Sequence, residues 1–181
     1  LIPVDAVDES RAEHWIEHHP KRGDIAFLQY TSGSTATPKG VMVSHGNLMV
    51  NERAIETGFS IGADDVFVSW LPLYHDMGLI GGLLQPIYRG IPSVLMSPTF
   101  FLQRPVRWLE AISRFRGTIS GGPDFSYRLC LDRIRDEQIE TLDLSSWRVA
   151  FSGAEPVRHA TLTGFIERFR PADFAADTAA P

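Results

Sequence analysis

The chain has 181 residues, of which 44% are hydrophobic and 22% are charged, enough for one domain with a core or for part of a larger domain. Its net charge of −5 argues against a protein that binds nucleic acid or an anionic membrane, because such proteins usually carry a basic face. The single cysteine, Cys130, excludes an internal disulfide bond and fits a reducing compartment, so we expect a cytoplasmic protein.

The two ends of the chain indicate how it is organised. Residues 1–4 are too short for the apolar region of a signal peptide, and no apolar run approaches the roughly 20 residues that cross a bilayer. There is no initiator methionine, and the last residues are small and rich in alanine. We therefore expect a piece of a longer protein, with a linker at 1–23, one folded region at 24–170 and a truncated tail at 171–181.

From Asp24 onward, short β-type runs alternate with helical patterns. The apolar segment Ile25–Tyr30 is bounded by polar turns and predicts a buried strand. Ser44 is placed to cap a helix that runs to about Thr57, with Gly58 as its stop. Further strands are expected at Val41–Val43, Asp65–Trp70, Pro92–Ser97, Thr118–Ser120 and Trp147–Phe151.

Helical periodicity becomes clearer in the second half of the chain. Gly78–Tyr88 is expected to be helical despite its glycines, and Pro105 suits a first helical turn. The apolar faces of the next three helices are expected to contain Trp108, Leu109, Ile112 and Phe115, then Phe125, Leu129 and Ile134, then Leu162, Phe165, Ile166 and Phe169. Of these, Phe125, Leu129, Phe165 and Ile166 are expected to lie in the core. The alternation predicts an α/β fold with a layered, largely parallel sheet flanked by helices.

The segment Tyr30–Gly40, YTSGSTATPKG, has the composition of a loop that binds the phosphates of ATP. Gly33 permits a positive φ and the close approach of a ligand, and successive backbone N–H groups in such a turn bind anions. Lys39 adds a cation. Further donors come from the hydroxyls of Thr31, Ser32, Ser34 and Thr35.

This loop is not a Walker A motif, because Lys39 precedes Gly40 and Val41 where that motif requires serine or threonine directly after the lysine. An interpretation as a GTPase or a kinase therefore loses its main support. The remaining alternative is an ordinary surface loop between two strands. We favour phosphate binding because the whole segment Tyr30–Gly40 has the features of a phosphate-binding loop, and not only its Ser-Gly-Ser centre.

At this loop the sequence resembles the acyl-adenylating superfamily of acyl-CoA synthetases, peptide-synthetase adenylation domains and luciferases. Ala36 departs from the pattern, since glycine is common at that position. Leu71–Gly78, LPLYHDMG, is similar to the motif that borders the acyl pocket, and Phe151–Val157, FSGAEPV, is similar to the segment along the adenine and ribose. The amino-acid sequence between these motifs looks most like that of the fatty acyl-AMP ligases. The resemblance extends from about Gly23 to Phe169.

The resemblance implies part of the large N-terminal domain of an enzyme that activates a medium- or long-chain fatty acid with ATP. The products would be an acyl-adenylate and pyrophosphate, with Mg²⁺ bridging phosphate oxygens. The acyl group would then pass to an acyl carrier protein or synthase module of a polyketide, peptide or lipid pathway.

The resemblance also implies roles for individual residues. The phosphates would be held by Thr31, Ser32, Gly33, Ser34, Thr35 and Lys39. The acyl pocket and its carboxylate end would involve His75, Met77, Gly78, Gly121, Gly122 and Pro123. Adenosine would contact Gly153, Ala154 and Glu155, and no residue is assigned as a direct metal ligand.

Structural alternatives stay open for several of these residues. His75 would otherwise be a histidine satisfied by structural hydrogen bonds, and we expect Asp76 to cap the following helix rather than to orient His75. The segment Gly121–Pro123 either lets the backbone approach the acyl chain or turns strand into helix. Glu155 also suits the positive end of a helix. An apolar tunnel could involve Met77, Leu79, Ile80, Leu83 and Leu84, although such spacing is more often core.

Several family features are missing from the sequence: a Tyr-Gly-x-x-Glu segment, a Thr-Gly-Asp segment, the hinge and the C-terminal domain with its lysine. We therefore expect an incomplete chain without full adenylation activity. Two other interpretations are an acyl-CoA ligase or amino-acid adenylation domain, and a non-catalytic nucleotide-binding module. The second motif favours a fatty acyl chain over an amino acid.

Overall fold

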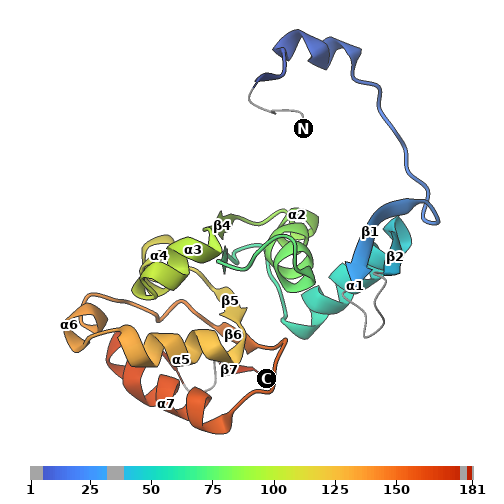
Figure 1. Cartoon of the computed structure of the whole chain (residues 1–181). Helices are drawn as coiled ribbons and strands as arrows, with labels where there is room; N and C mark the ends of the chain where they lie inside the picture. The colour runs from blue at the N-terminus through green and yellow to red at the C-terminus, as the bar shows by residue number, and fades with distance from the viewer. Residues whose placement is uncertain (1–5, 32–38, 176–178, 181) are drawn as a thin grey trace. The chain divides into compact units, whose positions relative to one another are not determined.

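The computed structural model describes residues 6–31, 39–175, 179 and 180 (Figure 1). The contacts of the chain divide it into two units, Leu1–Asn51 and Glu52–Pro181. The boundaries predicted from the sequence, near residues 23 and 170, stay a prediction.

The first unit contains a short 3₁₀ helix, Glu9–His14, followed by an antiparallel hairpin. Strand β1 (Ile25–Thr31) pairs with β2 (Lys39–Ser44) from Ile25 opposite Ser44 to Thr31 opposite Lys39. Both strands confirm the sequence prediction. The predicted burial of β1 is wrong, because a two-stranded sheet leaves its apolar side chains exposed. The exposed residues of β1 are Ile25, Leu28 and Tyr30.

Helix α1 (His45–Gly58) begins where the sequence predicts it. The hydroxyl oxygen of Ser44 accepts a hydrogen bond from the main-chain N–H of Asn47 at 3.1 Å. In return, the side-chain oxygen of Asn47 accepts from the N–H of Ser44 at 3.1 Å. This exchange satisfies two donors at the start of the helix, as in a capping box.

The second unit is built on a parallel sheet with the strand order β4-β3-β5-β6-β7. Together with the helices around it, this sheet confirms the predicted α/β class. The strands are β3 (Phe67–Ser69), β4 (Ser93–Leu95), β5 (Ile119–Gly122), β6 (Val149–Ser152) and β7 (Ala179–Ala180). The helices after β4 are α3 (Pro98–Gln103), α4 (Val106–Phe115), α5 (Asp124–Arg133), α6 (Asp136–Ile139), α7 (His159–Phe169) and the 3₁₀ turn Arg170–Ala172.

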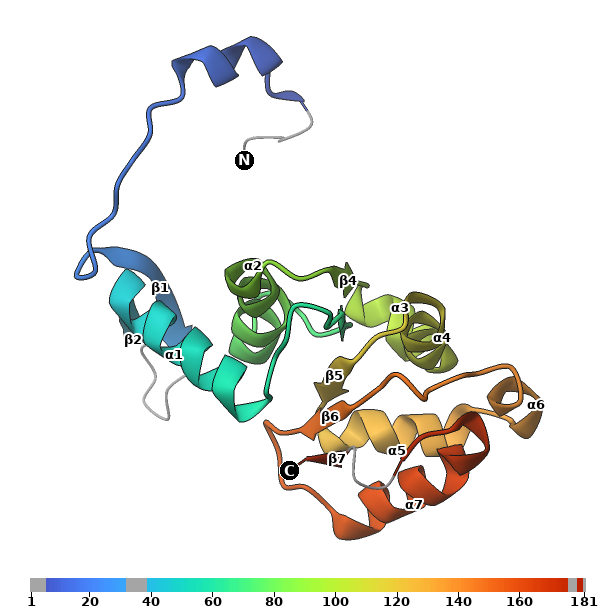
Figure 2. The same cartoon turned by 180° about the vertical axis from the view of Figure 1, so that it is seen from behind.

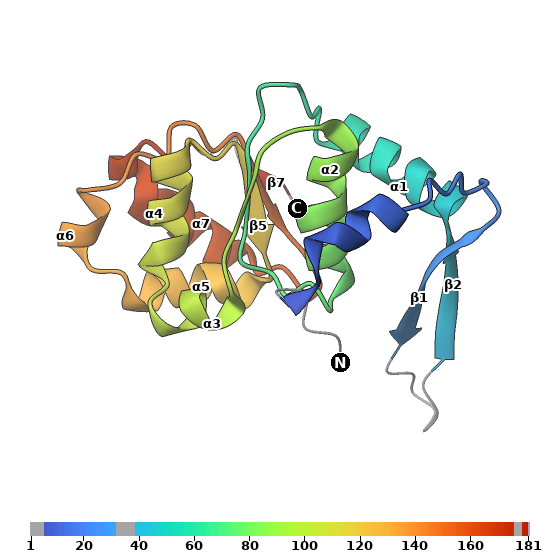
Figure 3. The ribbon, with the colours of Figure 1, turned by 90° about the horizontal axis from the view of Figure 1, so that it is seen from above.

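Side chains of the central strands alternate between two apolar clusters, as the period of two residues in a strand requires. In β3, Phe67 belongs to the smaller cluster and Val68 to the larger one; in β6, Val149 and Ala150 divide in the same way. Helices α3, α4, α5 and α7 lie on one side of the strands, and α2 (Gln85–Arg89) lies on the other (Figure 3). Helices α5 and α7 lie side by side (Figures 1 and 2). The sheet is therefore covered on both faces, as expected for a parallel sheet.

Trp108 of α4 lies at the centre of the larger cluster. The centroid of its ring lies 5.4 Å from that of Tyr127 and 5.3 Å from that of Trp147, both in edge-on contacts. Its indole N–H donates to the hydroxyl of Ser120 at 2.8 Å. The amphipathic face predicted for α4 is confirmed up to Ile112. Phe115 is a correction, because it is 45% exposed at the last turn of the helix.

The predicted turn at Gly121–Pro123 is also wrong, because Gly121 and Gly122 continue strand β5 and are buried. A Cβ atom on Gly121 would lie 2.2 Å from the carbonyl oxygen of Phe151, and one on Gly122 would lie 2.6 Å from the Trp70 ring. The two glycines are therefore required by close packing of β5 against its neighbours, and the helix starts only after Pro123.

The helix predicted at Gly78–Tyr88 is confirmed, but its first part is a π-helical segment, Met77–Leu84. The N–H of Gln85 bonds to the carbonyl oxygen of Ile80, five residues earlier. Helix α2 (Gln85–Arg89) follows and ends at Gly90, which has φ 72°. A left-handed glycine is a common helix stop.

Glu52 of α1 and Gln85 of α2 form a buried polar pair. Their residues are 2% and 0% exposed. The amide nitrogen of Gln85, oriented toward Glu52, donates to its main-chain oxygen at 2.9 Å and to its carboxylate. The other carboxylate oxygen of Glu52 has no partner within the described residues. Desolvation raises the pKa of this carboxyl group to about 7.

We expect Glu52→Gln to stabilise the folded protein at about pH 8 and to have little effect at about pH 5. A carboxyl group whose folded pKa lies above its ordinary value loses stability as the pH rises from that value, 4.5, to about 7. Replacing the ionisable carboxyl group with an amide should restore up to about 3 kcal/mol of the free energy of unfolding. Denaturant unfolding at both pH values measures the gain, with Glu167→Gln, which changes an exposed glutamate of α7, as the control. A gain that is equal at the two pH values would contradict the assignment.

Candidate active site

The second motif forms a tight turn that ends in the π-helical segment. The N–H of His75 donates to the carbonyl oxygen of Pro72 at 3.1 Å. The carboxylate of Asp76 accepts from the N–H of Met77 at 2.7 Å, which confirms its predicted capping role. Gly78 is buried, and a Cβ atom there would lie 2.2 Å from the Pro72 oxygen. The start of this helix is therefore locked against the turn before it.

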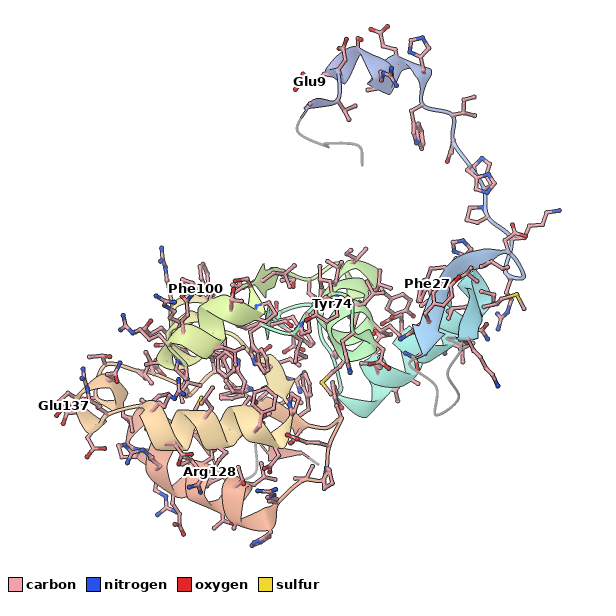
Figure 4. The ribbon with its side chains drawn as sticks, viewed as in Figure 1. Glu9, Phe27, Tyr74, Phe100, Arg128 and Glu137 are labelled. Carbon is pink, nitrogen blue, oxygen red and sulfur yellow. The ribbon has the colours of Figure 1, made fainter. Side chains whose placement is uncertain are left out.

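The carboxylate of Asp76 also lies beside the imidazole of His75, and its alternative role of orienting this ring stays a prediction. The carboxylate lies 2.8 Å from Nδ1 of His75. The same Nδ1 atom accepts a hydrogen bond from the main-chain N–H of Met77 at 3.2 Å. The side chains of His75 and Asp76 are about half exposed. Tyr74 is almost fully exposed (Figure 4).

The third motif follows strand β6 and meets the second motif. Gly153 lies beside Met77, because a Cβ atom on Gly153 would be 3.4 Å from the Met77 methyl carbon. Ala154 has φ 67°, a left-handed conformation that is uncommon for alanine and is often found at functional sites. The two motifs are thus adjacent in space although they are separated by about seventy residues.

A pocket of about 230 Å³ lies where these two motifs meet. Its wall is apolar except for the His75 imidazole and the Trp70 indole. Such a cavity, with only two polar side chains at its wall, suits an acid with a hydrocarbon chain. The lining residues are Trp70, Leu71, Pro72, His75, Met77, Pro98, Leu102, Pro123, Phe125 and Ala154.

The structure brings together four of the residues predicted from the sequence. His75, Met77 and Pro123, predicted for the acyl pocket, line this cavity with Ala154, predicted for adenosine. The predicted roles of these residues stay predictions. Residues that do not line the cavity are Gly78, Gly121 and Gly122, and also Leu79, Ile80, Leu83 and Leu84 from the predicted tunnel.

Of the lining residues outside the second and third motifs, four were missed by the sequence analysis. Phe125 was expected in the core, which is a correction, because it is 43% exposed at the pocket. Pro98 and Leu102 belong to α3, for which no helix was predicted. The pair Ser97-Pro98 was a usable signal, since the hydroxyl of Ser97 accepts from the N–H of Phe100 at 3.2 Å and proline suits a first turn. The fourth residue is Trp70, which was expected only as the end of a strand.

The predicted phosphate loop is described only at its ends. Thr31 pairs with Lys39 across the hairpin, and Lys39 is exposed. The hairpin therefore holds the first and last predicted phosphate ligands opposite each other. The predicted ligands Ser32, Gly33, Ser34 and Thr35 lie outside the described residues.

Within the described residues, no group of three or more His, Cys, Asp or Glu side chains is placed to hold a metal ion. In the same part of the chain, no helix combines the length and the apolar composition needed to cross a bilayer. Cys130 is buried with a free thiol, and burial raises its pKa.

The chain is similar to several fatty-acid ligases in sequence. It is 52% identical over 176 residues to a medium-chain-fatty-acid–acyl-carrier-protein ligase of Teredinibacter turnerae, covering 97% of this chain and 27% of that protein. It is 46% identical over 180 residues to a ligase of the same description from Moorena producens, covering 99% of this chain and 30% of that one. The chain thus spans less than a third of the length of these relatives.

Solved structures and a family comparison agree with this similarity. The fold matches the crystal structure of a fatty acid AMP ligase from Legionella pneumophila with a TM-score of 0.94 and 49% identity, over 98% of this chain and 31% of that one. A structure of the Legionella fatty acyl-adenylate ligase with acyl adenylate and pyrophosphate matches equally well. Residues 3–176 match the family of AMP-binding enzymes. The chain belongs to this AMP-binding enzyme family.

Proposed function

We propose that the full-length protein that contains this chain is a fatty acyl-AMP ligase that activates a medium- or long-chain fatty acid with ATP. A carboxylate oxygen of the acid attacks the α-phosphorus of ATP. The bond from this phosphorus to the bridging oxygen breaks, and pyrophosphate leaves with the electron pair. The products are an acyl-adenylate and pyrophosphate.

The observation that carries this proposal is the apolar pocket between the second and third motifs. The hydrocarbon chain would lie along the apolar wall, and the carboxylate would lie toward His75, the one titratable group of the wall. Ala154 belongs both to this wall and to the segment proposed to contact adenosine. A reaction that joins an apolar acid to a nucleotide needs its two binding segments adjacent, as these are.

ATP binding is supported by the hairpin that presents Thr31 and Lys39 on opposite strands. A lysine side chain with an exposed cationic head at the end of such a loop fits phosphate oxygens. Mg²⁺ would neutralise charge on these oxygens, as hard cations do. In this proposal Lys39 and the hydroxyls of the loop hold the phosphates while pyrophosphate develops its charge.

The acyl acceptor is proposed to be an acyl carrier protein of a polyketide, peptide or lipid pathway. The names of the Teredinibacter and Moorena relatives support this acceptor. A cytoplasmic location is proposed because ATP and the carrier protein would be available there. The buried thiol of Cys130 is compatible with that compartment.

ATP–pyrophosphate exchange by the full-length protein tests this function. We expect exchange with fatty acids of medium or long chain and none with amino acids, because no carboxylate that could pair with an ammonium group is among the described residues of the pocket wall. Adding acyl carrier protein or coenzyme A after the first step identifies the acceptor. Exchange with an amino acid but with no fatty acid would overturn the proposal, and acyl transfer to coenzyme A alone would make the protein an acyl-CoA ligase.

A further inference from the structure

The first turn of α5 and the segment 155–161, which leads into α7, are linked by two carboxylates. Each segment contributes one carboxylate that accepts hydrogen bonds from the other segment. The side chain of Glu155 accepts a hydrogen bond from the main-chain N–H of Phe125 at 2.7 Å. In the opposite direction, Asp124 accepts from the N–H of Arg158 at 2.9 Å and from the hydroxyl of Thr161 at 3.1 Å. N–H groups in the first turn of a helix lack partners within the helix, and a carboxylate suits this positive end.

The two halves of this exchange differ in burial. Asp124 and Thr161 are each 4% exposed, so their contact is an internal anchor that would be costly to leave unpaired. Glu155 is exposed and lines a hollow of about 160 Å³ together with Arg128 and Arg158; Arg128 is labelled on α5 in Figure 4. Within the described residues its carboxylate makes no ion pair with either arginine and bonds to the backbone instead.

The bond from Glu155 joins two parts of the candidate active site. Phe125, whose N–H donates to the Glu155 carboxylate, lines the apolar pocket. Ala154, which directly precedes Glu155, lines the same pocket. Ala154 is also the residue held at φ 67°. The turn at residues 153–155 is thus fixed on one side by strand β6 and on the other side by the hydrogen bond between Glu155 and the N–H of Phe125 in α5.

We propose that Glu155 is a positioning residue, whose side chain holds the pocket wall at Phe125 in register with the Gly153–Glu155 turn. This inference rests on the proposed function, in which the wall receives the acyl chain and the turn contacts adenosine. Its carboxylate acts through Phe125 and does not touch substrate. The acid and the α-phosphate must meet within a few tenths of an ångström of the productive geometry. Loss of the hydrogen bond between Glu155 and Phe125 should therefore slow formation of the acyl-adenylate more than it weakens the binding of either substrate.

The test uses ATP–pyrophosphate exchange by the full-length ligase with a medium-chain acid. We expect Glu155→Ala to lower kcat/KM about 10- to 100-fold, the effect of losing one hydrogen bond to a charged group, with most of the loss in kcat. Glu155→Gln keeps an oxygen that accepts from Phe125 and should recover most of the activity. Glu167→Ala, which alters an exposed glutamate on α7, is the control and should leave exchange unchanged.

A readout independent of activity is hydrogen exchange at the Phe125 amide, which should become faster in Glu155→Ala and stay slow in Glu155→Gln. If Glu155→Ala does not fold, Glu155→Asp shortens the reach by one methylene group and should show the same loss of kcat. Wild-type kinetics in Glu155→Ala, or equal losses in the Ala and Gln variants, would overturn the positioning role while the proposed function stands. A wild-type protein that activates no fatty acid would overturn both.

Discussion

Replacing Lys39 with alanine is expected to lower ATP–pyrophosphate exchange by the full-length protein about 100- to 1,000-fold. Losing one preorganised group that stabilises transition-state charge has an effect of this size. Lys39 is the first residue of β2 and lies opposite Thr31 in the hairpin. Its ammonium group can therefore be placed by the strand while its flexible stem follows the phosphates.

The chain offers a matched control for this experiment. Lys21 is also exposed and also belongs to the first unit, but it precedes β1 at a turn where its N–H donates to Asp24 at 2.8 Å. We expect Lys21→Ala to retain exchange, because it removes the same charge away from the loop. Equal losses in the two variants would attribute the effect to general electrostatics, and full exchange in Lys39→Ala would show that the proposed phosphate contact is wrong.

Local sequence signals predicted the elements whose causes are local. Ser44 caps α1 at its predicted start, because capping depends on neighbouring residues, whereas Gly58, the predicted stop, is the last residue of the helix and the left-handed residue after it is Ser60. The strands around Phe67 and Val149 were predictable from short apolar runs, and the parallel sheet followed from their alternation with helices. The π-helical start of the helix at Met77 was not predictable from local sequence, which also does not reveal that Gly82 packs against Ser69 of strand β3.

Errors arose where packing between distant segments decides the structure. Gly121 and Gly122 have the composition of a turn, and only the approach of Phe151 and Trp70 shows why a strand needs glycine there. Phe125 fits a helical apolar face, and only the fold places it at a pocket. For the site, the motifs around His75 and Ala154 were predictable as segments, but their meeting required the crossover that brings β6 into the sheet.

A buried ion pair in the second unit supports the largest stability prediction. Asp65 is 6% exposed and accepts from the Arg148 guanidinium at 2.6 and 3.0 Å. The Thr118 hydroxyl and the N–H of Gly62 also donate to it, at 2.6 and 2.7 Å. Arg148 donates in addition to the carbonyl oxygens of Phe59 and Ser60. The network thus joins the loop after α1 to strands β5 and β6.

These contacts determine how Asp65 titrates. Burial alone would raise its pKa, but the hydrogen bonds from Arg148, then from Thr118 and Gly62, and the charge of Arg148 outweigh burial. The pKa of the carboxyl group is therefore lowered below its ordinary value, 3.8. The carboxylate contributes stability above that value, and the contribution is lost as the pH falls through the lower pKa of the folded state.

We expect Asp65→Ala to reduce the free energy of unfolding by about 3 kcal/mol at neutral pH, the lower end for breaking a buried pair, because Arg148 is partly exposed. Unfolding of the full-length protein, with hydrogen exchange in residues 59–69, measures the loss. Asp64→Ala is the control, since Asp64 is exposed next to Asp65, and it should change stability by less than about 0.5 kcal/mol. The difference between the Asp65 variant and the wild type should shrink below about pH 4. A difference that persists undiminished in acid would show that Asp65 acts through packing and not through its charge.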